Sequence, residues 1–184
     1  MYLKKSVHLI LVIVFLLIFI GSMRIMRFYA NSVENYNNEK IFDLRFGYST
    51  TDVNKYLAFL SSEGKQVYLN KFYLFDSFYP IIYTIFYILT LSLLLSLCFP
   101  NIRKANFLLL IPIIGSIFDY LENNFIKTFL NDVNGINDFN VKLSSTFTIL
   151  KFISIYVTFA IMIILLVTLI IKIFRNEIEW QNGT

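Results

Sequence analysis

The residues of this 184-residue chain that could carry chemistry are acids and a lysine embedded in apolar sequence. Asp119 and Glu122 lie in the second half of one apolar run, and Lys151 lies within another. Because an ionisable side chain in a membrane span is costly, such residues usually face the protein interior or a water-filled cavity. Two neighbouring carboxyls in different protonation states can also exchange protons with a substrate. Asp119, Glu122 and Lys151 are therefore the candidate catalytic residues.

Helical spacing connects these three residues to further polar side chains. Asp119, Glu122 and Asn123 share one helix face, and Thr148 shares a face with Lys151. The apolar run that precedes them offers an acid at its start and a tyrosine two turns later. At 1.5 Å per residue, these groups all fall in the outer third of a bilayer about 30 Å thick. We predict a buried polar cluster that binds a ligand or holds the helices together, formed by Asp76, Tyr83, Asp119, Glu122, Asn123, Thr148 and Lys151.

The charges of this cluster do not balance. Asp76, Asp119 and Glu122 are acids, whereas Lys151 is the base inside the apolar runs, with Arg24 as a second base if it turns inward. A buried charge without a partner is so costly that the group normally becomes neutral. We therefore predict an ion pair between Lys151 and Asp119 or Glu122, and one carboxyl that stays protonated.

These residue types leave several roles open. A buried polar network can fix the register of membrane helices, and the same residues could bind a lipid headgroup or a small ligand entering from the outer leaflet. We expect one of these two roles rather than an enzyme, because a buried charge pair alone says little about chemistry. The alternatives are a membrane-embedded acid–base enzyme acting on a lipid, and an ion- or proton-coupled transporter that works as a dimer.

The rest of the sequence argues against several classes of protein. The chain has one cysteine, Cys98, and one histidine, His8, which disfavours disulfides, zinc clusters and a Ser-His-Asp relay within it. Nucleotide-binding, zinc-protease and hydrolase motifs are absent from the sequence, so we expect no metal and no cofactor. The net charge of +4 gives no reason to expect nucleic acid. The expected partners are membrane lipids, with a homodimer or a partner membrane protein as alternatives.

The elements that must position these residues are membrane helices. The chain is 57% hydrophobic and 15% charged, whereas soluble domains carry about 25% charged residues. A span needs about 20 mostly apolar residues. We predict an all-α, integral membrane four-helix bundle that forms a single domain over residues 1–184. Its spans cover about residues 7–27, 72–99, 105–127 and 144–174.

Basic residues predict the orientation of this bundle, because they are retained in cytoplasmic flanks. Arg24 and Arg27 flank the outer end of the first span and argue against this orientation, but six basic residues outweigh them. These six are Lys4 and Lys5, Arg103 and Lys104, and Lys172 and Arg175. We expect both termini in the cytoplasm and, from a composition typical of AT-rich genomes, a bacterial inner membrane.

The outer segment, residues 28–71, contains its own short helix. Ser49 with an acid three residues later is typical of a helix N-cap, and apolar residues then recur at helical spacing. We predict an amphipathic helix over Thr50–Glu63, ended by a glycine, and a second helix that starts near Lys65 and continues into the second span. The amphipathic helix is either a lid on the bundle or a docking element for a partner or the headgroup layer.

Four segments of the chain form a recognisable set: FDLRFGYS (42–49), DSFYPIIY (76–83), PIIGSIFDYLENN (112–124) and TILK (148–151). Together they resemble a group of uncharacterised bacterial four-span membrane proteins. The resemblance implies a family signature formed by Asp76, Pro80, Tyr83, Asp119, Glu122, Asn123 and Lys151. It implies no activity, and the similarity in span number to sterol isomerase-like proteins concerns the fold alone.

Overall fold

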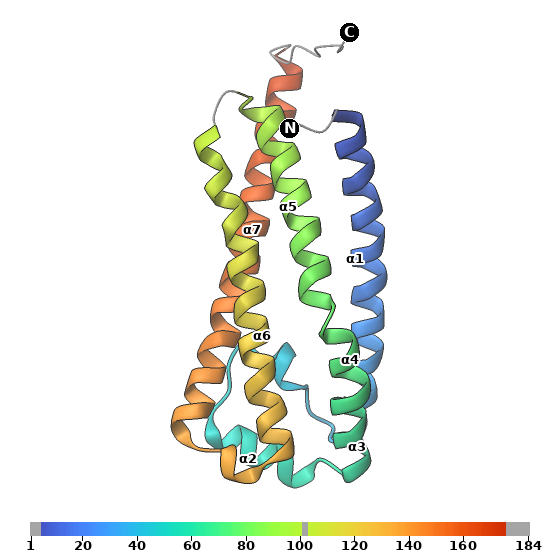
Figure 1. The fold of residues 1–184 in the computed structure, drawn as a ribbon, viewed down its shortest axis with the longest axis vertical. Coiled ribbons are helices and arrows are strands. Elements are labelled where there is room, and N and C mark those ends of the chain that lie inside the picture. The colour runs from blue at the N-terminus through green and yellow to red at the C-terminus, as the bar shows by residue number, and fades with distance from the viewer. Residues whose placement is uncertain (1–4, 101–102, 176–184) are drawn as a thin grey trace.

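Four long helices form the molecule. The computed structural model describes residues 5–100 and 103–175, and this part of the chain contains helices and turns but no strands. Four helices in it are long and apolar enough to cross a membrane, which confirms the predicted all-α bundle (Figure 1). They are Lys5–Glu34, Ser62–Cys98, Ala105–Asn131 and Asp138–Phe174. Lys4, which contributed to the predicted orientation, lies outside the described residues.

The bundle has two distinct ends. Helix α1 (Lys5–Glu34) begins and helix α7 (Asp138–Phe174) ends at the same end, which we call the terminal end (Figure 1). The opposite end is the segment end, because the connecting segment, residues 35–61, lies there. Both helices extend beyond the predicted spans at the segment end, because the last turns of α1 and the first turns of α7 are polar and hydropathy marks only the apolar part. The Asn137 side chain caps α7 by accepting a hydrogen bond from the Asn140 amide at 2.9 Å.

The second span is an interrupted helix. It consists of α3 (Ser62–Val67), a π-helical turn η2 (Tyr68–Phe72), α4 (Tyr73–Asp76) and α5 (Tyr79–Cys98). The break between α4 and α5 precedes Pro80, which lacks an N–H group and clashes with the carbonyl four residues earlier. The predicted helix that starts near Lys65 and continues into the second span is confirmed as Ser62–Cys98, although the π-helical turn and this break interrupt its regular α-helical geometry.

The connecting segment contains η1 (Phe42–Leu44) and α2 (Thr50–Phe59). Ser49 and Asp52 form the predicted N-terminal cap, as a reciprocal capping box. The predicted C-terminal stop at Glu63–Gly64 is wrong, because α2 ends at Phe59 and the Ser61 side chain caps a new helix by accepting from the Gly64 amide at 3.1 Å.

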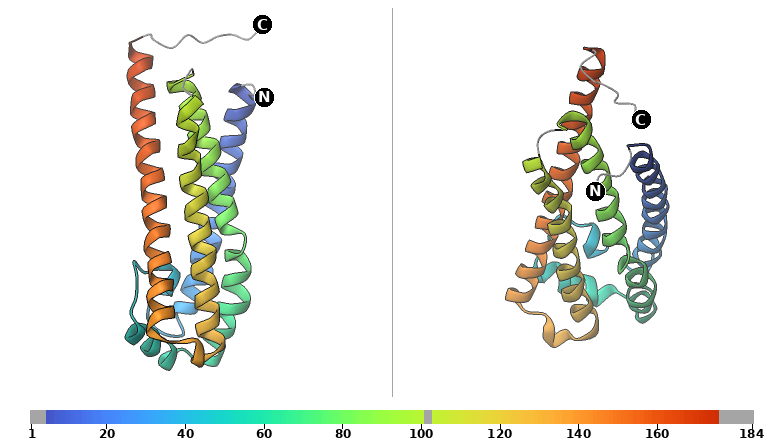
Figure 2. Two further views of the ribbon diagram at one scale, coloured as in Figure 1. Left: turned by 60° about the vertical axis from the view of Figure 1, so that its left-hand side comes forward. Right: turned by 45° about the horizontal axis from the view of Figure 1, so that its top comes forward.

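The connecting segment fills the segment end of the bundle instead of lying on its surface. Ile41, Phe42 and Tyr56 are fully buried and belong to the same apolar core as Ile126 and Phe129 of α6 (Leu110–Asn131). Helix α2 packs against α7, and Figure 2 shows the segment folded across the end of the bundle. The lid interpretation of α2 therefore describes its position, because the helix covers the bundle core.

The four spans do not close into a uniform ring. A 3₁₀ turn, η3 (Arg103–Leu109), leads into α6, which packs along α7, while α1 packs mainly on α5. Gly115 allows α6 and α7 to approach, since a Cβ atom there would lie 3.0 Å from the Ser154 Cβ. Figures 1 and 2 show α1 separated from α7, and the most apolar stretch of α1 has no buried residue.

Candidate functional site

A buried ion pair joins the third and fourth spans. The Lys151 Nζ lies 2.5 Å from the Glu122 Oε2 and 3.3 Å from the Asp119 Oδ1. The Thr148 hydroxyl donates to the other Glu122 oxygen at 2.6 Å. All four side chains are buried. The predicted ion pair is confirmed, and Lys151 contacts both acids instead of one of them.

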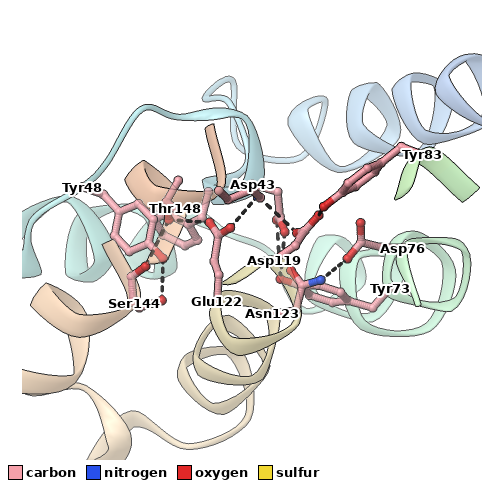
Figure 3. A network of polar contacts seen from close by, with 12 residues as sticks. Asp43, Tyr48, Tyr73, Asp76, Tyr83, Asp119, Glu122, Asn123, Ser144 and Thr148 are labelled. Atoms are coloured by element: carbon pink, nitrogen blue, oxygen red, sulfur yellow. Dashed lines mark hydrogen bonds and ion pairs between the residues drawn. The ribbon is translucent and has the colours of Figure 1, made fainter. Parts of the chain in front are cut away.

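The second span supplies two further contacts to this group. The Tyr83 hydroxyl donates to the Asp119 Oδ2 at 3.1 Å, and Asp76 accepts a hydrogen bond from the Asn123 side-chain amide (Figure 3). The structure therefore brings together all seven residues of the predicted cluster. The Oδ1 of Asp76 makes no hydrogen bond with the described residues, although the side chain is only 4% exposed.

The connecting segment contributes an acid, Asp43, that sequence reasoning missed. It lies in η1, and its Oδ2 accepts a hydrogen bond from the Tyr68 hydroxyl at 2.6 Å, with Tyr73 farther away at 3.4 Å. Burial raises the pKa of Asp43, and the nearby charge of Lys151 partly opposes this. The signal that could have found Asp43 is its place between Phe42 and Leu44, because an acid with two apolar neighbours can be carried inward.

A second contact of the segment fixes it to the fourth span. The Tyr48 hydroxyl and the Ser144 Oγ are 2.6 Å apart, and the Tyr48 amide donates to the Ser145 Oγ at 2.9 Å. Burial raises the pKa of the Tyr48 hydroxyl, which keeps it protonated. Gly47 precedes it with a φ of 93°, a left-handed conformation that favours glycine. These contacts hold η1 against the cluster.

A cavity of about 460 Å³ adjoins the cluster. Four ionisable side chains form its buried floor, namely Asp43, Asp76, Asp119 and Lys151. Its walls are aromatic and aliphatic side chains of α1, η2, α5 and α7, including Phe19, Met26, Phe72, Tyr79, Tyr83, Tyr87, Phe152 and Ile155. The cavity is therefore mostly apolar, with polar groups concentrated at one place.

The mouth of the cavity lies between α1 and α7. Met23 on α1 is 43% exposed and Tyr156 on α7 is 60% exposed, and both line the cavity. Arg27 and Leu44 complete the exposed rim. Because these exposed lining residues lie on the side of the bundle, the cavity opens between two helices and not along the bundle axis.

The cluster lies near the edge of the surface that faces lipid. On α6, the last exposed apolar side chain toward the segment end is Leu121, and the next exposed residue, Asn124, is polar. On α7, exposed Thr146 lies on the segment side and exposed Ile153 on the terminal side of the ion pair. On these two helices, exposed polar side chains therefore begin close to the level of the cavity floor.

The first span does not supply the second base considered in the sequence. Arg24 is exposed on α1, and Arg27 is 3.7 Å from Glu34 at the cavity rim. The buried group thus contains Lys151 as its base against Asp43, Asp76, Asp119 and Glu122, which raises the number of acids from the predicted three to four. Within residues 5–100 and 103–175, no three His, Cys, Asp or Glu side chains are arranged to hold a metal ion.

The carboxyls of the cluster differ in their surroundings, because some have a fixed basic partner and one faces the cavity. Asp119 and Glu122 contact Lys151 directly, so each has a basic partner. Asp76 has no basic contact among the described residues and faces the cavity. Such a site can bind a polar group and can exchange a proton with it. Comparison with family models, with curated proteins and with solved structures finds no match to this chain.

Proposed function

We propose that this chain is a membrane protein that binds an amphiphile, with the polar head of the ligand at the cavity floor. The observation that carries this proposal is the lateral cavity that ends on the polar cluster. Ligand sites typically enclose about 300–1,000 Å³ and combine apolar walls with a few placed polar groups. A polar network with a purely structural role needs no adjacent cavity. Here Asp76 of the network lines one.

The predicted orientation places this mouth in the outer leaflet. With both termini in the cytoplasm of a bacterium, the segment end faces outward and the cavity receives ligands from the outer half of the inner membrane. The four segments that resemble bacterial four-span proteins include Asp43, Asp76, Asp119 and Lys151, which form the floor.

A second candidate function is acid–base catalysis on a bound lipid. It is favoured by the unequal surroundings of Asp119 and Asp76, which line the same cavity. Lys151 contacts Asp119, whereas Asp76 has no basic contact among the described residues. Different surroundings for two carboxyls are typical of acid–base pairs in enzymes. Transport through a homodimer and binding of a partner membrane protein stay predictions.

The test fills the cavity without touching the charged floor. Ile155→Trp places a larger side chain in the wall, and Ile153→Trp, which faces lipid on the same helix, is the matched control. Met23→Trp at the rim and Ile20→Trp on the lipid side of α1 form an independent pair. Native mass spectrometry of the protein with added bacterial lipids then counts the bound molecules.

We expect the two cavity variants to lose bound lipid while both controls retain it. Equal lipid binding by all four variants, or no binding by the unchanged protein, would contradict the proposal. The lipids recovered after incubation are analysed for chemical change. Turnover that depends on Asp119 and Asp76 would favour the enzyme over the binding protein.

A further inference from the structure

We propose that the ligand head seated on the cavity floor is a positively charged amine. The ligand class is then an amphiphile with an ammonium group, such as a long-chain amine or an ethanolamine lipid. This inference rests on the proposed function, because it names the chemistry of the molecule that the same cavity receives.

The charge distribution of the floor is the first argument. Lys151 is the buried base, and Asp119 and Glu122 already contact it. Asp43 and Asp76 are buried as well, and neither forms an ion pair within the described part of the chain. Both line the cavity. A cation entering the cavity would therefore meet two carboxyls that have no basic partner, and its charge would favour their ionised forms.

The hydrogen-bonding capacity of the cavity points to a donor. The Asp76 Oδ1 has no hydrogen bond, and neither has the hydroxyl of Tyr87, a cavity residue that is only 8% exposed. Both residues line the cavity, so a ligand there can reach these two atoms. An ammonium group offers three donors and no acceptor, so it can satisfy the carboxyl and the hydroxyl together.

The aromatic wall suits a cation as well. Tyr79, Tyr83 and Tyr87 follow one another on a face of α5, with ring centroids 5.5 Å and 5.9 Å apart. A cation within about 6 Å of such a ring is attracted to its face. The Phe19 ring of α1 stacks on the Phe86 ring of α5, with ring centroids 5.1 Å apart, and so extends this aromatic group. Carboxyls and aromatic rings around one cavity are a combination that holds ammonium groups.

The remaining walls define the rest of the ligand. Met26, Leu44 and Ile155 are apolar and extend from the floor toward the lipid-facing mouth, so they suit a hydrocarbon chain. Arg27 lies at the rim with a side chain 55% exposed. It can contact the phosphate of a zwitterionic lipid while the amine of that lipid lies at the floor.

The experiment compares ligands that differ in the head alone. Full-length protein in dodecylmaltoside is titrated at pH 7 with hexadecylamine or hexadecanol, and with phosphatidylethanolamine or phosphatidylglycerol of identical acyl chains. Binding is measured by native mass spectrometry. We expect each amine to bind at least tenfold more tightly than its partner without an amine.

Variants locate the amine. Asp76→Asn should weaken amine binding about tenfold and leave hexadecanol binding unchanged, whereas Asp132→Asn, at an exposed acid, should change neither. Tyr87→Phe removes a hydroxyl with no hydrogen bond to break, and a several-fold loss of amine binding is expected. It keeps the test decisive if Asp76→Asn fails to fold. Arg27→Gln should weaken the binding of phosphatidylethanolamine and leave hexadecylamine binding unchanged.

The outcomes separate the two proposals. If amine and non-amine ligands bind equally and Ile155→Trp blocks both, the amine proposal is overturned and the lipid-binding cavity stands. If no ligand binds, both proposals fail. Binding of phosphatidylethanolamine without hexadecylamine supports the amine proposal and identifies a phospholipid as its source, provided that Asp76→Asn weakens it. Amine binding that neither Asp76→Asn nor Tyr87→Phe weakens overturns the assignment to this floor.

Discussion

The two ends of the bundle are built from different interactions. At the segment end, charged and hydroxyl side chains of three spans and the connecting segment contact one another below a covering helix. At the terminal end, the buried side chains are mostly leucine, as in the cluster of Leu91, Leu94, Leu95, Cys98 and Leu165. Polar contacts there mainly reach backbone carbonyls, as from Lys172 to the Cys98 oxygen at 2.5 Å.

This difference indicates which end determines how the helices pair. Lipid chains are as apolar as leucine, so apolar faces gain no hydrophobic stabilisation from meeting inside a membrane. Leucine packing at the terminal end is therefore compatible with several helix registers. The ion pair of Lys151 at the segment end is compatible with far fewer, because Asp119 and Glu122 must both face it. We expect the segment end to specify the bundle.

Removing the buried base should have the largest effect. Lys151→Met leaves Asp119 and Glu122 buried without their cation, and losing one partner of a buried ion pair costs about 3–5 kcal/mol. The free energy of unfolding in mixed micelles of dodecylmaltoside and SDS measures this loss. Lys142→Met, at an exposed lysine of the same helix, is the control and should change little.

A small loss in Lys151→Met would show that the ion pair does not specify the bundle, and the comparison of the two ends would fail. A triple variant with Asp119→Asn and Glu122→Gln sharpens the result. It should recover part of the stability, because neutral amides are less costly to bury than carboxylates without a partner.

Thr148→Val tests a single hydrogen bond at the same end. The hydroxyl donates to Glu122 at 2.6 Å in a fully buried place, and leaving a buried acceptor without its donor costs about 1–3 kcal/mol. Thr146→Val is the control, because the exposed Thr146 hydroxyl bonds to the Lys142 carbonyl of its own helix. Equal losses in the two variants would mean that the Glu122 contact contributes nothing specific.

Hydropathy made part of this end predictable from the sequence. Asp119, Glu122 and Lys151 were found because charges are conspicuous inside apolar runs, and helical spacing then gave their depth and facing. Asp43 was not found, because it lies in a segment whose sequence is compatible with water. Its burial depends on Tyr68, 25 residues later, and on a turn that carries η1 into the bundle.

The cavity could not be predicted from the sequence either. It exists because α1 packs on α5 while α7 packs on α6 and α5, leaving space between α1 and α7. Both of these helices are apolar along most of their length, and their sequences do not distinguish a face against lipid from a face against a neighbouring helix. The break before Pro80 and the π-helical turn are equally local adjustments that hydropathy does not report.

The pH dependence of stability tests Asp43. Because burial raises its pKa, the folded protein keeps the proton at pH values where the unfolded chain has lost it. The stability contributed by this proton is greatest below about pH 4, the ordinary range for Asp, and falls as the pH rises. Relative to Asp43→Asn, the protein should lose at most about 1.4 kcal/mol per pH unit above that range.

The measurement is the difference in unfolding free energy between the protein and Asp43→Asn from pH 4 to 8. Asp132→Asn, at an exposed acid, should give a flat difference. A difference that increases with pH would show that Lys151 and the tyrosines hold Asp43 as a carboxylate, which would make the floor of the cavity more negative than proposed.

The smallest effect is expected at the terminal end. Ser92→Ala removes the contact between the Ser92 Oγ and the His8 Nε2, which are 3.0 Å apart. The His8 Nε2 keeps its hydrogen bond with the Leu89 carbonyl oxygen at 3.0 Å. Hydrogen bonds between membrane helices contribute about 0.6 kcal/mol on average, and we expect no more here. A loss as large as that of Thr148→Val, measured in the same micelles, would remove the contrast between the ends.

The long-range contacts of Tyr48 have a consequence for biosynthesis. Its partner Ser145 follows 97 residues later in the chain, and ribosomes add about 5–20 residues per second. The loop that carries Tyr48 must therefore wait for roughly 5–20 s until Ser145, near the start of the last helix, has been synthesised. During that interval its aromatic and acidic side chains lack their final neighbours. A nascent chain interrupted before α7 would therefore lack the contacts that hold this loop to the last helix.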